Sequence, residues 1–377
     1  FRYAKVFCTE GAIRIRRFAM KEVSNPAAEE FTFRSSDEKI QKLFAAALNT
    51  FKYNCVDILM DCPSRERAGW LCDGYFTGRV EHILTGRNDV EHDFLENFLL
   101  PKRVEHLPKG MLPMCYPSEH PDGNFIPNWA MWFVLELERY YSETADADLV
   151  RRAKNKIYAL FEYFKKYENE QELLERLEGW VFIEWSKAAE FTNDVNYPTN
   201  MLYALTLQKA GEMYKDAGLI AKAERIRGVI RTNSFDGEFF TDHAVRSDGQ
   251  LSPCRDISEV CQYYAFFTET ATPDLYPALW ETLVKHFGPD RKKTNAYPAV
   301  WHANSFIGNY LRLMLLERHG LKEQLLAEAV GYFLYMAEKT NTLWENDTDF
   351  ASCNHGFASY VIQWIIDRNE NGIVLSE

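Results

Sequence analysis

Residues 61–73 read Asp61-Cys62-Pro63-Ser64-Arg65-Glu66-Arg67-Ala68-Gly69-Trp70-Leu71-Cys72-Asp73 and combine three carboxylates, two arginines and a tryptophan. The apolar run 56–60 precedes them and Tyr75-Phe76 follows, so we expect this stretch to border a packed interior. Buried carboxylates require partners, and arginines can supply two hydrogen bonds at once. The cluster is therefore a candidate site. A structural ion-pair network that caps a helix is the alternative.

Composition limits the class of protein. The chain has 377 residues, of which 46% are hydrophobic, so a large core is expected and global disorder is excluded. No apolar run reaches the roughly 18 residues that a membrane span needs. The formal net charge of −12 argues against nucleic acid and anionic membranes as partners. Aromatic residues make up 15% of the chain, which suits a protein that stacks on sugars but also a well-packed helical core.

The eight cysteines are scattered and form no Cys-x-x-Cys pair. Their spacing indicates neither a zinc site nor a disulfide framework, and we predict no metal site and no cofactor. The sequence leaves the localisation open: a periplasmic or extracellular protein is suspected, and a cytoplasmic one is possible.

The first part of the chain differs from the rest. Residues 1–6 and 12–16 alternate between apolar and polar side chains, which is typical of β-strands. The pattern changes after Asn25-Pro26, and Ser35-Ser36-Asp37-Glu38 reads as a capping box that opens a helix. We therefore expect a β segment over residues 1–33 and a helical domain over residues 34–377.

The helical domain is predicted to contain about twelve helices. They are expected near 36–52, 74–86, 90–107, 127–143, 148–167, 198–217, 218–231, 256–270, 276–287, 301–319, 321–338 and 355–369. Segments that are apolar on all sides, such as 131–135 and 263–267, alternate with amphipathic ones such as 148–167. Because a helix that is apolar all round must be buried, this alternation favours an inner ring of helices inside an outer ring, the (α/α)6 barrel. An α-solenoid is the rival, but the sequence shows no fixed repeat.

The stretch 61–73 resembles the signature of the α-L-rhamnosidases of glycoside hydrolase family 78, Asp-Cys-Pro-x-Arg-Glu-x-x-Gly-Trp-x-Gly-Asp. Eight positions match in register, whereas Cys72 replaces a glycine and Ser64 stands where glutamine is frequent. The resemblance implies an (α/α)6 catalytic barrel. It also implies that residues 1–33 are the end of a preceding β-sandwich, so that other domains of a longer parent chain are expected partners.

Hydrolysis of a glycoside requires two carboxyl groups across the scissile bond. The resemblance places the general acid at Glu66. It places the general base at Glu345, in a Trp-Glu loop before Ser352-Cys353-Asn354-His355. The family inverts the anomeric configuration, so the two carboxyls are expected roughly 6.5–9.5 Å apart, with room for a water molecule.

Further residues are expected to bind the sugar. Glu184 stands where the family has an aspartate, and each tryptophan has core packing as its alternative role. The candidates are Asp61, Arg65, Trp70, Asp73, Trp129, Glu184, Trp185, Trp344 and His355.

The sequence thus predicts an inverting glycoside hydrolase that removes terminal α-L-rhamnose from a carbohydrate substrate. Two alternatives stay open: an (α/α)6 glycosidase for a different sugar, and a carbohydrate-binding toroid without catalysis.

Overall fold

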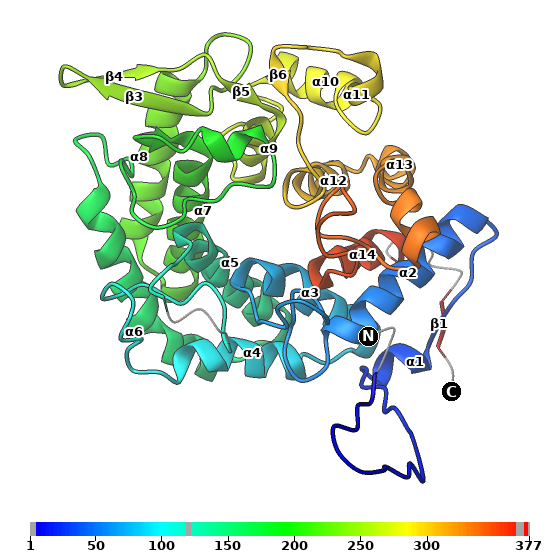
Figure 1. The fold of residues 1–377 in the computed structure, drawn as a ribbon. Coiled ribbons are helices and arrows are strands. Elements are labelled where there is room, and N and C mark those ends of the chain that lie inside the picture. Colours follow the sequence, from blue (N-terminus) through cyan, green and yellow to red (C-terminus); the bar gives the residue numbers. More distant parts are fainter. Residues whose placement is uncertain (1–4, 118–121, 367–372, 376–377) are drawn as a thin grey trace.

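The computed structural model describes residues 5–117, 122–366 and 373–375, and it forms a closed double ring of helices (Figure 1). Consecutive helices alternate between the two rings, and each inner helix contacts the next one around the centre. The inner ring consists of α3 (Leu71–Thr85), α5 (Pro127–Thr144), α7 (Tyr197–Tyr214), α9 (Glu259–Phe267), α12 (Gly308–Arg318), and the 3-10 helix η3 (Gly356–Tyr360) with α14 (Val361–Ile366).

The outer ring surrounds these helices. It consists of α2 (Glu38–Asn54), α4 (Asp89–Leu99), α6 (Ala147–Phe164), α8 (Ala217–Ser234), α10 (Pro277–His286) and α13 (Lys322–Thr340). The shorter helices are α1 (Ala27–Glu30), η1 (Lys165–Tyr167), η2 (Lys187–Glu190) and α11 (Arg291–Thr294).

Side-chain polarity explains which helix lies in which ring. All residues of α9 are buried, whereas α6 buries one stripe that includes Leu149, Ala153, Ile157 and Leu160. These positions repeat every three or four residues, as on the core-facing side of an amphipathic helix. The predicted alternation of buried and half-exposed helices, and with it the (α/α)6 barrel, is confirmed.

The ring closes by contacts between its first and last hairpins. The hydroxyl of Thr50 accepts a hydrogen bond from the Leu343 amide, and the carbonyl of Asp61 accepts one from the Gly356 amide. Tyr310 of α12 packs against Phe357 of η3, with ring centroids 5.1 Å apart. An open solenoid lacks such closure, so this alternative is excluded.

Three small sheets complete the fold. Strand β1 (Phe31–Phe33) pairs antiparallel with β7 (Ile373–Leu375). Strands β2 (Val195–Asn196), β3 (His243–Ser247) and β4 (Gln250–Pro253) form an antiparallel sheet, and β5 (Ile257–Ser258) pairs parallel with β6 (Val300–Trp301). Strands β2 and β5 directly precede inner helices α7 and α9, so both lie at the N-terminal ends of inner helices.

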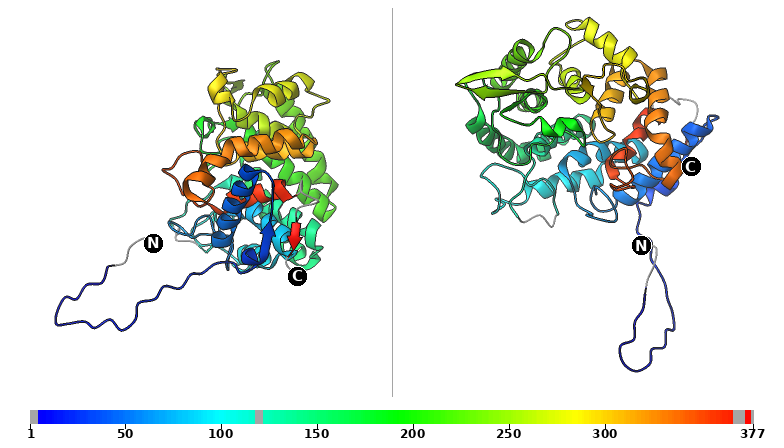
Figure 2. Two further views of the ribbon diagram at one scale, coloured as in Figure 1. Left: turned by 90° about the vertical axis from the view of Figure 1, so that its right-hand side faces the viewer. Right: turned by 45° about the horizontal axis from the view of Figure 1, so that its top comes forward.

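The strands expected at residues 1–6 and 12–16 are not present among the described residues. Residues 5–24 contain no strand, bend at residues 9–11, and project from the body as a long exposed loop (Figure 2). Alternating polarity creates a strand only where a partner strand pairs with it, and nothing in the described chain pairs with this segment. Residues 1–4 lie outside the described residues.

Some predicted helix ends were also wrong. The helix expected over 90–107 ends at Leu99, two residues before Pro101, and the one expected over 301–319 begins at Gly308. Pro101 has no backbone N–H with which to continue the helical hydrogen bonds, which accounts for the first difference. The helix expected over 355–369 is η3 followed by α14, and its end beyond residue 366 lies outside the described residues.

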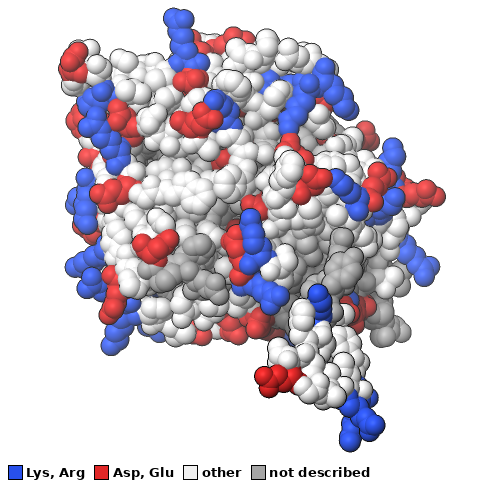
Figure 3. Space-filling model, in the orientation of Figure 1, with Lys and Arg blue, Asp and Glu red and all other residues white. Residues whose placement is uncertain are grey.

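No helix in the described part of the chain is long and apolar enough to cross a membrane. On the face shown in Figure 3, basic and acidic side chains are interspersed, without a continuous basic surface.

Candidate active site

A cavity of about 250 Å³ lies at the N-terminal ends of inner helices. Asp73 belongs to the first turn of α3 and Trp129 to the first turn of α5, whereas Phe306 lies two residues before α12 and His355 is the N-cap residue of η3. The wall combines acidic and aromatic side chains and consists of Asp61, Arg65, Glu66, Trp70, Asp73, Ile126, Trp129, Trp180, Phe182, Trp185, Phe306, Glu345 and His355.

The loop between α2 and α3 contributes four of these residues and is closed on itself. The Asp61 amide donates a hydrogen bond to the Ala68 carbonyl, and the Asp61 carboxylate accepts one from the Ala68 amide. Gly69 permits the loop to pack closely, because a Cβ there would lie 2.4 Å from the Tyr116 carbonyl oxygen. The matched motif therefore folds into a compact turn that presents Arg65, Glu66 and Trp70 to the cavity.

Glu66 and Glu345, which are 279 positions apart in the chain, face the same cavity. Nη2 of Arg65 lies 2.8 Å from Oε1 of Glu66 and 3.4 Å from Oε2 of Glu345. Oε1 of Glu66 and Oε2 of Glu345 are therefore at most 6.2 Å apart, the sum of these two contacts. This is slightly shorter than the roughly 6.5–9.5 Å expected for an inverting pair. The two side chains differ in exposure, which is 28% for Glu66 and 8% for Glu345.

Each glutamate is held by a tryptophan. The indole N–H of Trp70 donates to Oε2 of Glu66 over 2.9 Å, and that of Trp185 donates to Oε1 of Glu345 over 2.9 Å. The Ser352 amide donates to the other oxygen of Glu345. Hydrogen bonds to a charged carboxylate are stronger than neutral ones, so both side chains are well positioned.

Asp73 and His355 form a buried pair at the base of the cavity. Nε2 of His355 lies 2.8 Å from Oδ1 of Asp73. Burial raises the pKa of Asp73 to about 6, although His355 opposes the shift. Burial lowers the pKa of His355, but the hydrogen bond and charge of Asp73 outweigh it, and the net shift is upward. The contact with Asp73 thus favours the charged form of the His355 imidazole.

Two polar atoms at this base have no hydrogen-bond partner among the described residues. They are Oδ2 of Asp61 and Nδ1 of His355, both buried. Buried polar atoms are normally satisfied by a partner or by water. Both residues also line the cavity.

Aromatic rings form another part of the wall. Trp129 stacks on Phe306 with centroids 6.0 Å apart, and Phe182 packs edge-on against both. Trp180 and Trp185 are less enclosed, with 45% and 41% of their surface exposed. Sequence reasoning did not single out Ile126, Trp180, Phe182 or Phe306. The stretch 179–185 contained a signal for Trp180 and Phe182, whereas nothing in the sequence marked Phe306.

Two predicted binding residues do not line the cavity. Glu184 is completely buried and accepts hydrogen bonds from the Asn304 and Gly308 amides, and burial raises its pKa to about 8. Trp344 is also buried, and its indole N–H donates to the Thr340 hydroxyl. The other predicted residues, Asp61, Arg65, Glu66, Trp70, Asp73, Trp129, Trp185, Glu345 and His355, come together in the wall.

A closed double ring of helices with two carboxylates across an aromatic cavity is the architecture of a six-hairpin glycosidase domain. The chain belongs to the family described as bacterial α-L-rhamnosidase six-hairpin glycosidase domain, whose model matches residues 28–368. A comparison with curated proteins found no match.

Solved structures share this fold. A family 78 rhamnosidase of a Bacillus species superposes with a TM-score of 0.78 at 18% identity, over 92% of this chain and 36% of the other. A rhamnosidase from Klebsiella oxytoca with rhamnose bound gives 0.71 at 17% identity, over 89% and 64%. A family 63 mannosylglycerate hydrolase from Thermus thermophilus gives 0.55 at 11% identity, over 86% and 100%. This chain thus spans about a third of the Bacillus protein and under two thirds of the Klebsiella protein.

Proposed function

We propose that this chain is the catalytic domain of an inverting glycoside hydrolase that removes terminal α-L-rhamnose, with Glu66 as general acid and Glu345 as general base. The observation that carries the proposal is the shared contact of both carboxylates with Arg65 at one cavity. Glycoside hydrolysis needs such a pair, one member protonated and the other ionised.

The different surroundings of the two glutamates support these roles. A general acid must reach the glycosidic oxygen, beyond which the leaving group extends to solvent, and Glu66 is the more exposed. A general base must hold a water molecule beneath the sugar, and Glu345 lies deeper beside the buried His355, 4.0 Å from its Nδ1. The side chain of Arg65 is 56% exposed and can move aside when a sugar enters.

The size and lining of the cavity agree with one sugar ring. A volume of about 250 Å³ accommodates a monosaccharide, so the enzyme is expected to act on a terminal residue. The free atoms of Asp61 and His355 would bind hydroxyl groups, and the Trp129–Phe306 wall would receive an apolar face or methyl group of the sugar. Terminal rhamnose offers both, since it is a 6-deoxy sugar.

The substrate would also extend beyond this domain. Because the related rhamnosidases are much longer, we propose that other domains of a parent chain act with this one. The exposed apolar side chains of residues 5–24, which include Phe7, Ile13 and Phe18, are consistent with contacts to such a domain.

The test is hydrolysis of a panel of aryl glycosides by the wild type, Glu66→Gln and Glu345→Gln. Removing a general acid or base is expected to lower kcat by about 10²–10⁴. The Glu66→Gln loss should shrink as the leaving group improves, because a good leaving group needs no proton, whereas the Glu345→Gln loss should not. Glu238→Gln, at an exposed position on the chain, is the matched control and should retain full activity.

Three results would each contradict one part of the proposal. If another aryl glycoside is hydrolysed faster than the rhamnoside, the proposed sugar is wrong, but the proposed roles of the two glutamates are unaffected. Full activity of Glu66→Gln on a poor leaving group would overturn the general-acid assignment. The first-formed anomer, observed by NMR, should be β-L-rhamnose, and an α product would refute inversion.

A further inference from the structure

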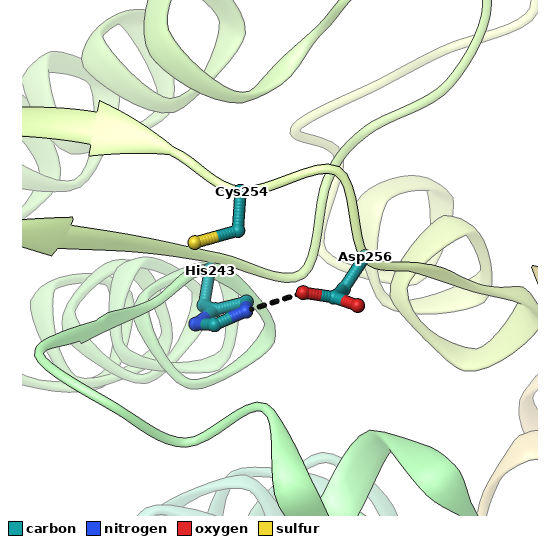
Figure 4. A group of neighbouring side chains, drawn as sticks. All are labelled: His243, Cys254 and Asp256. Carbon is teal, nitrogen blue, oxygen red and sulfur yellow. Dashed lines mark hydrogen bonds and ion pairs between the residues drawn. The ribbon is translucent and has the colours of Figure 1, made fainter.

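A group of metal-ligating side chains lies away from the cavity, on the three-stranded sheet. His243 begins β3, and Cys254 and Asp256 follow β4 (Figure 4). One ring nitrogen of His243, Sγ of Cys254 and a carboxylate oxygen of Asp256 all lie within 4.8 Å of one another. Nitrogen, thiolate sulfur and carboxylate oxygen are the ligands that zinc takes in proteins.

The backbone fixes the three residues in place. The Cys254 amide donates to the His243 carbonyl over 2.9 Å, so the two residues are neighbours across the strands. The Asp242 amide donates to the Asp256 carbonyl over 2.9 Å, so the backbone of Asp256 is also held beside the start of β3. In Figure 4 the three side chains converge on one side of the hairpin. The arrangement therefore does not depend on a flexible loop.

His243 is buried and held in a fixed orientation. Its residue is 5% exposed, its Nε2 lies 3.0 Å from Oδ2 of Asp256, and its Nδ1 has no hydrogen-bond partner among the described residues. The ring is held by stacking on Phe191, with centroids 5.6 Å apart and planes at 14°. The nitrogen that faces Asp256 is Nε2, so a metal ion between these two side chains would bind the imidazole there.

We propose that His243, Cys254 and Asp256 bind one divalent cation of the zinc class, with water completing the coordination. Metal–ligand bonds of about 2.0–2.3 Å place tetrahedral ligands roughly 3.3–3.8 Å apart. The His243–Asp256 contact is already shorter than this, and the sulfur needs a rotation of its side chain to reach the ion. Binding replaces the thiol proton, so that Cys–SH and Zn²⁺ give a Cys–S–Zn bond and release one H⁺ to solvent.

The position of the site suggests what the ion does. Strand β2 pairs with β3, and the Asn196 side chain donates to the Phe191 carbonyl. Phe191 ends the short segment that begins at Trp185 and includes η2. A cation on His243 would thus fix the hairpin β3–β4 against the segment that positions Trp185 at the cavity, and it would act as a structural ion.

A second group, His92, Asp93 and Glu96, meets the same distance criterion but offers no such argument. It contains no sulfur ligand, Asp93 is exposed, and Glu96 forms an ion pair with Arg152. This group serves as the control for nonspecific binding.

The experiment is a titration of chelator-treated, reduced protein with Co²⁺ and then Zn²⁺. We expect one equivalent of Co²⁺ to produce the near-ultraviolet band of a cobalt–thiolate bond, and Zn²⁺ to abolish it. The band should be absent in Cys254→Ser. His243→Asn should weaken binding by at least about 100-fold, because loss of a residue that only hydrogen-bonds to a metal ligand already costs roughly 10–100-fold in affinity. Cys353→Ser and His92→Asn should behave like the wild type.

A measurement on the wild type makes the result independent of variant folding. With Zn²⁺ at 100 times its Kd, the fraction of protein with a free site falls about 100-fold. The rate at which iodoacetamide alkylates Cys254 should fall by a similar factor, and mass spectrometry measures it. Equal alkylation with and without Zn²⁺, binding without a saturable equivalent, or an unchanged cobalt band in Cys254→Ser would overturn the proposal. None of these readouts depends on glycosidase activity.

Discussion

Two pairs of adjacent residues border the cavity, and in each pair the side chains point in opposite directions. Trp185 and Glu345 line the cavity, whereas their neighbours Glu184 and Trp344 are buried in the core. Consecutive side chains of an extended loop alternate in direction, as in a strand. The cavity thus receives one member of each pair, and the core must accommodate the other, even when it is a carboxylate.

The buried carboxyl of Glu184 makes stability depend on pH. Its pKa is about 8 in the folded protein, because of burial, against 4.5 when unperturbed. Between these values the folded state binds more protons than the unfolded state, so the free energy of unfolding falls as pH rises from 4.5 to 8. Glu184→Gln removes this titration, and its stability relative to the wild type should increase across the same range. Urea unfolding at several pH values checks this, and a constant difference between the two proteins would contradict it.

The Trp185 indole is expected to position Glu345. Trp185→Phe keeps an aromatic ring but removes the N–H donor. Because hydrogen bonds to charged groups contribute about 1.5–3 kcal/mol, kcat should fall roughly 10–100-fold, with a smaller change in KM.

Trp180→Phe is the matched control for this variant. Trp180 lines the same cavity, and no bond from its indole to a carboxylate is seen among the described residues. Steady-state kinetics should show a much smaller loss of kcat for Trp180→Phe. Equal losses in both variants would show that the rings matter only as surfaces.

Some residues of the site could be predicted from the sequence, and others could not. The motif 61–73 and the loop 344–355 were found because fixed spacing marks them, and most of their acidic and aromatic side chains line the cavity. Phe306 was missed because a phenylalanine before a helix is typical of any core. The opposite directions of Glu184 and Trp185 were missed because sequence does not show which side of a loop faces the interior.

At the scale of elements, α3 combines residues of the site with close packing against its neighbours. A Cβ on Gly74 would lie 2.8 Å from Oε1 of Glu136, and one on Gly78 would lie 2.5 Å from Glu91. Glu91 is buried and paired with Arg139. The two glycines thus allow α3, which carries Asp73, to approach the polar side chains of α4 and α5.

Gly78→Ala should therefore destabilise the protein, although alanine favours helix. We expect a loss of about 1–3 kcal/mol from overpacking and displacement of Glu91, against a gain of roughly 0.5–1 kcal/mol in helix propensity. Gly228→Ala in the outer helix α8 is the matched control, because a Cβ there meets no atom within 4 Å, and it should stabilise. Denaturant unfolding measures both, and a stabilised Gly78→Ala variant would refute the packing argument.

Helix positions were predictable to the extent that polarity sets them. The twelve main helices were expected from their periodicity, but α1 and α11 are too short to show a period. Helix ends differed where a loop packs into place, as at the start of α12, where the Gly308 amide donates to the buried Glu184 carboxyl. Such a long-range contact is not visible in local sequence.

At the scale of the whole molecule, most of the segment 5–24 projects from the toroid, and Glu22 near its end contacts Lys52 and Tyr53 of α2. The segment is exposed and contains Lys5, Arg14, Arg16, Arg17 and Lys21. No residue of the cavity wall belongs to it. Brief trypsin treatment should cut at these positions and leave the helical body intact.

The trimmed protein should keep the kcat and the melting temperature of the uncut protein, as measured by assay and circular dichroism. The basic side chains of the outer helices provide the internal control, because cleavage there requires unfolding. Loss of activity on trimming, or a segment as resistant as the body, would show that residues 5–24 pack against the toroid in solution.

The contacts that close the ring determine when the site can exist. Asp61 and Gly356 are joined directly, and both carboxyls of the proposed mechanism reach the cavity only when the last hairpin meets the first. A nascent chain, or one returning from denaturant, can thus form most of its helices while it is still inactive. Regained hydrolysis should lag behind the recovery of helical ellipticity, and the length of that lag reports the time needed for ring closure.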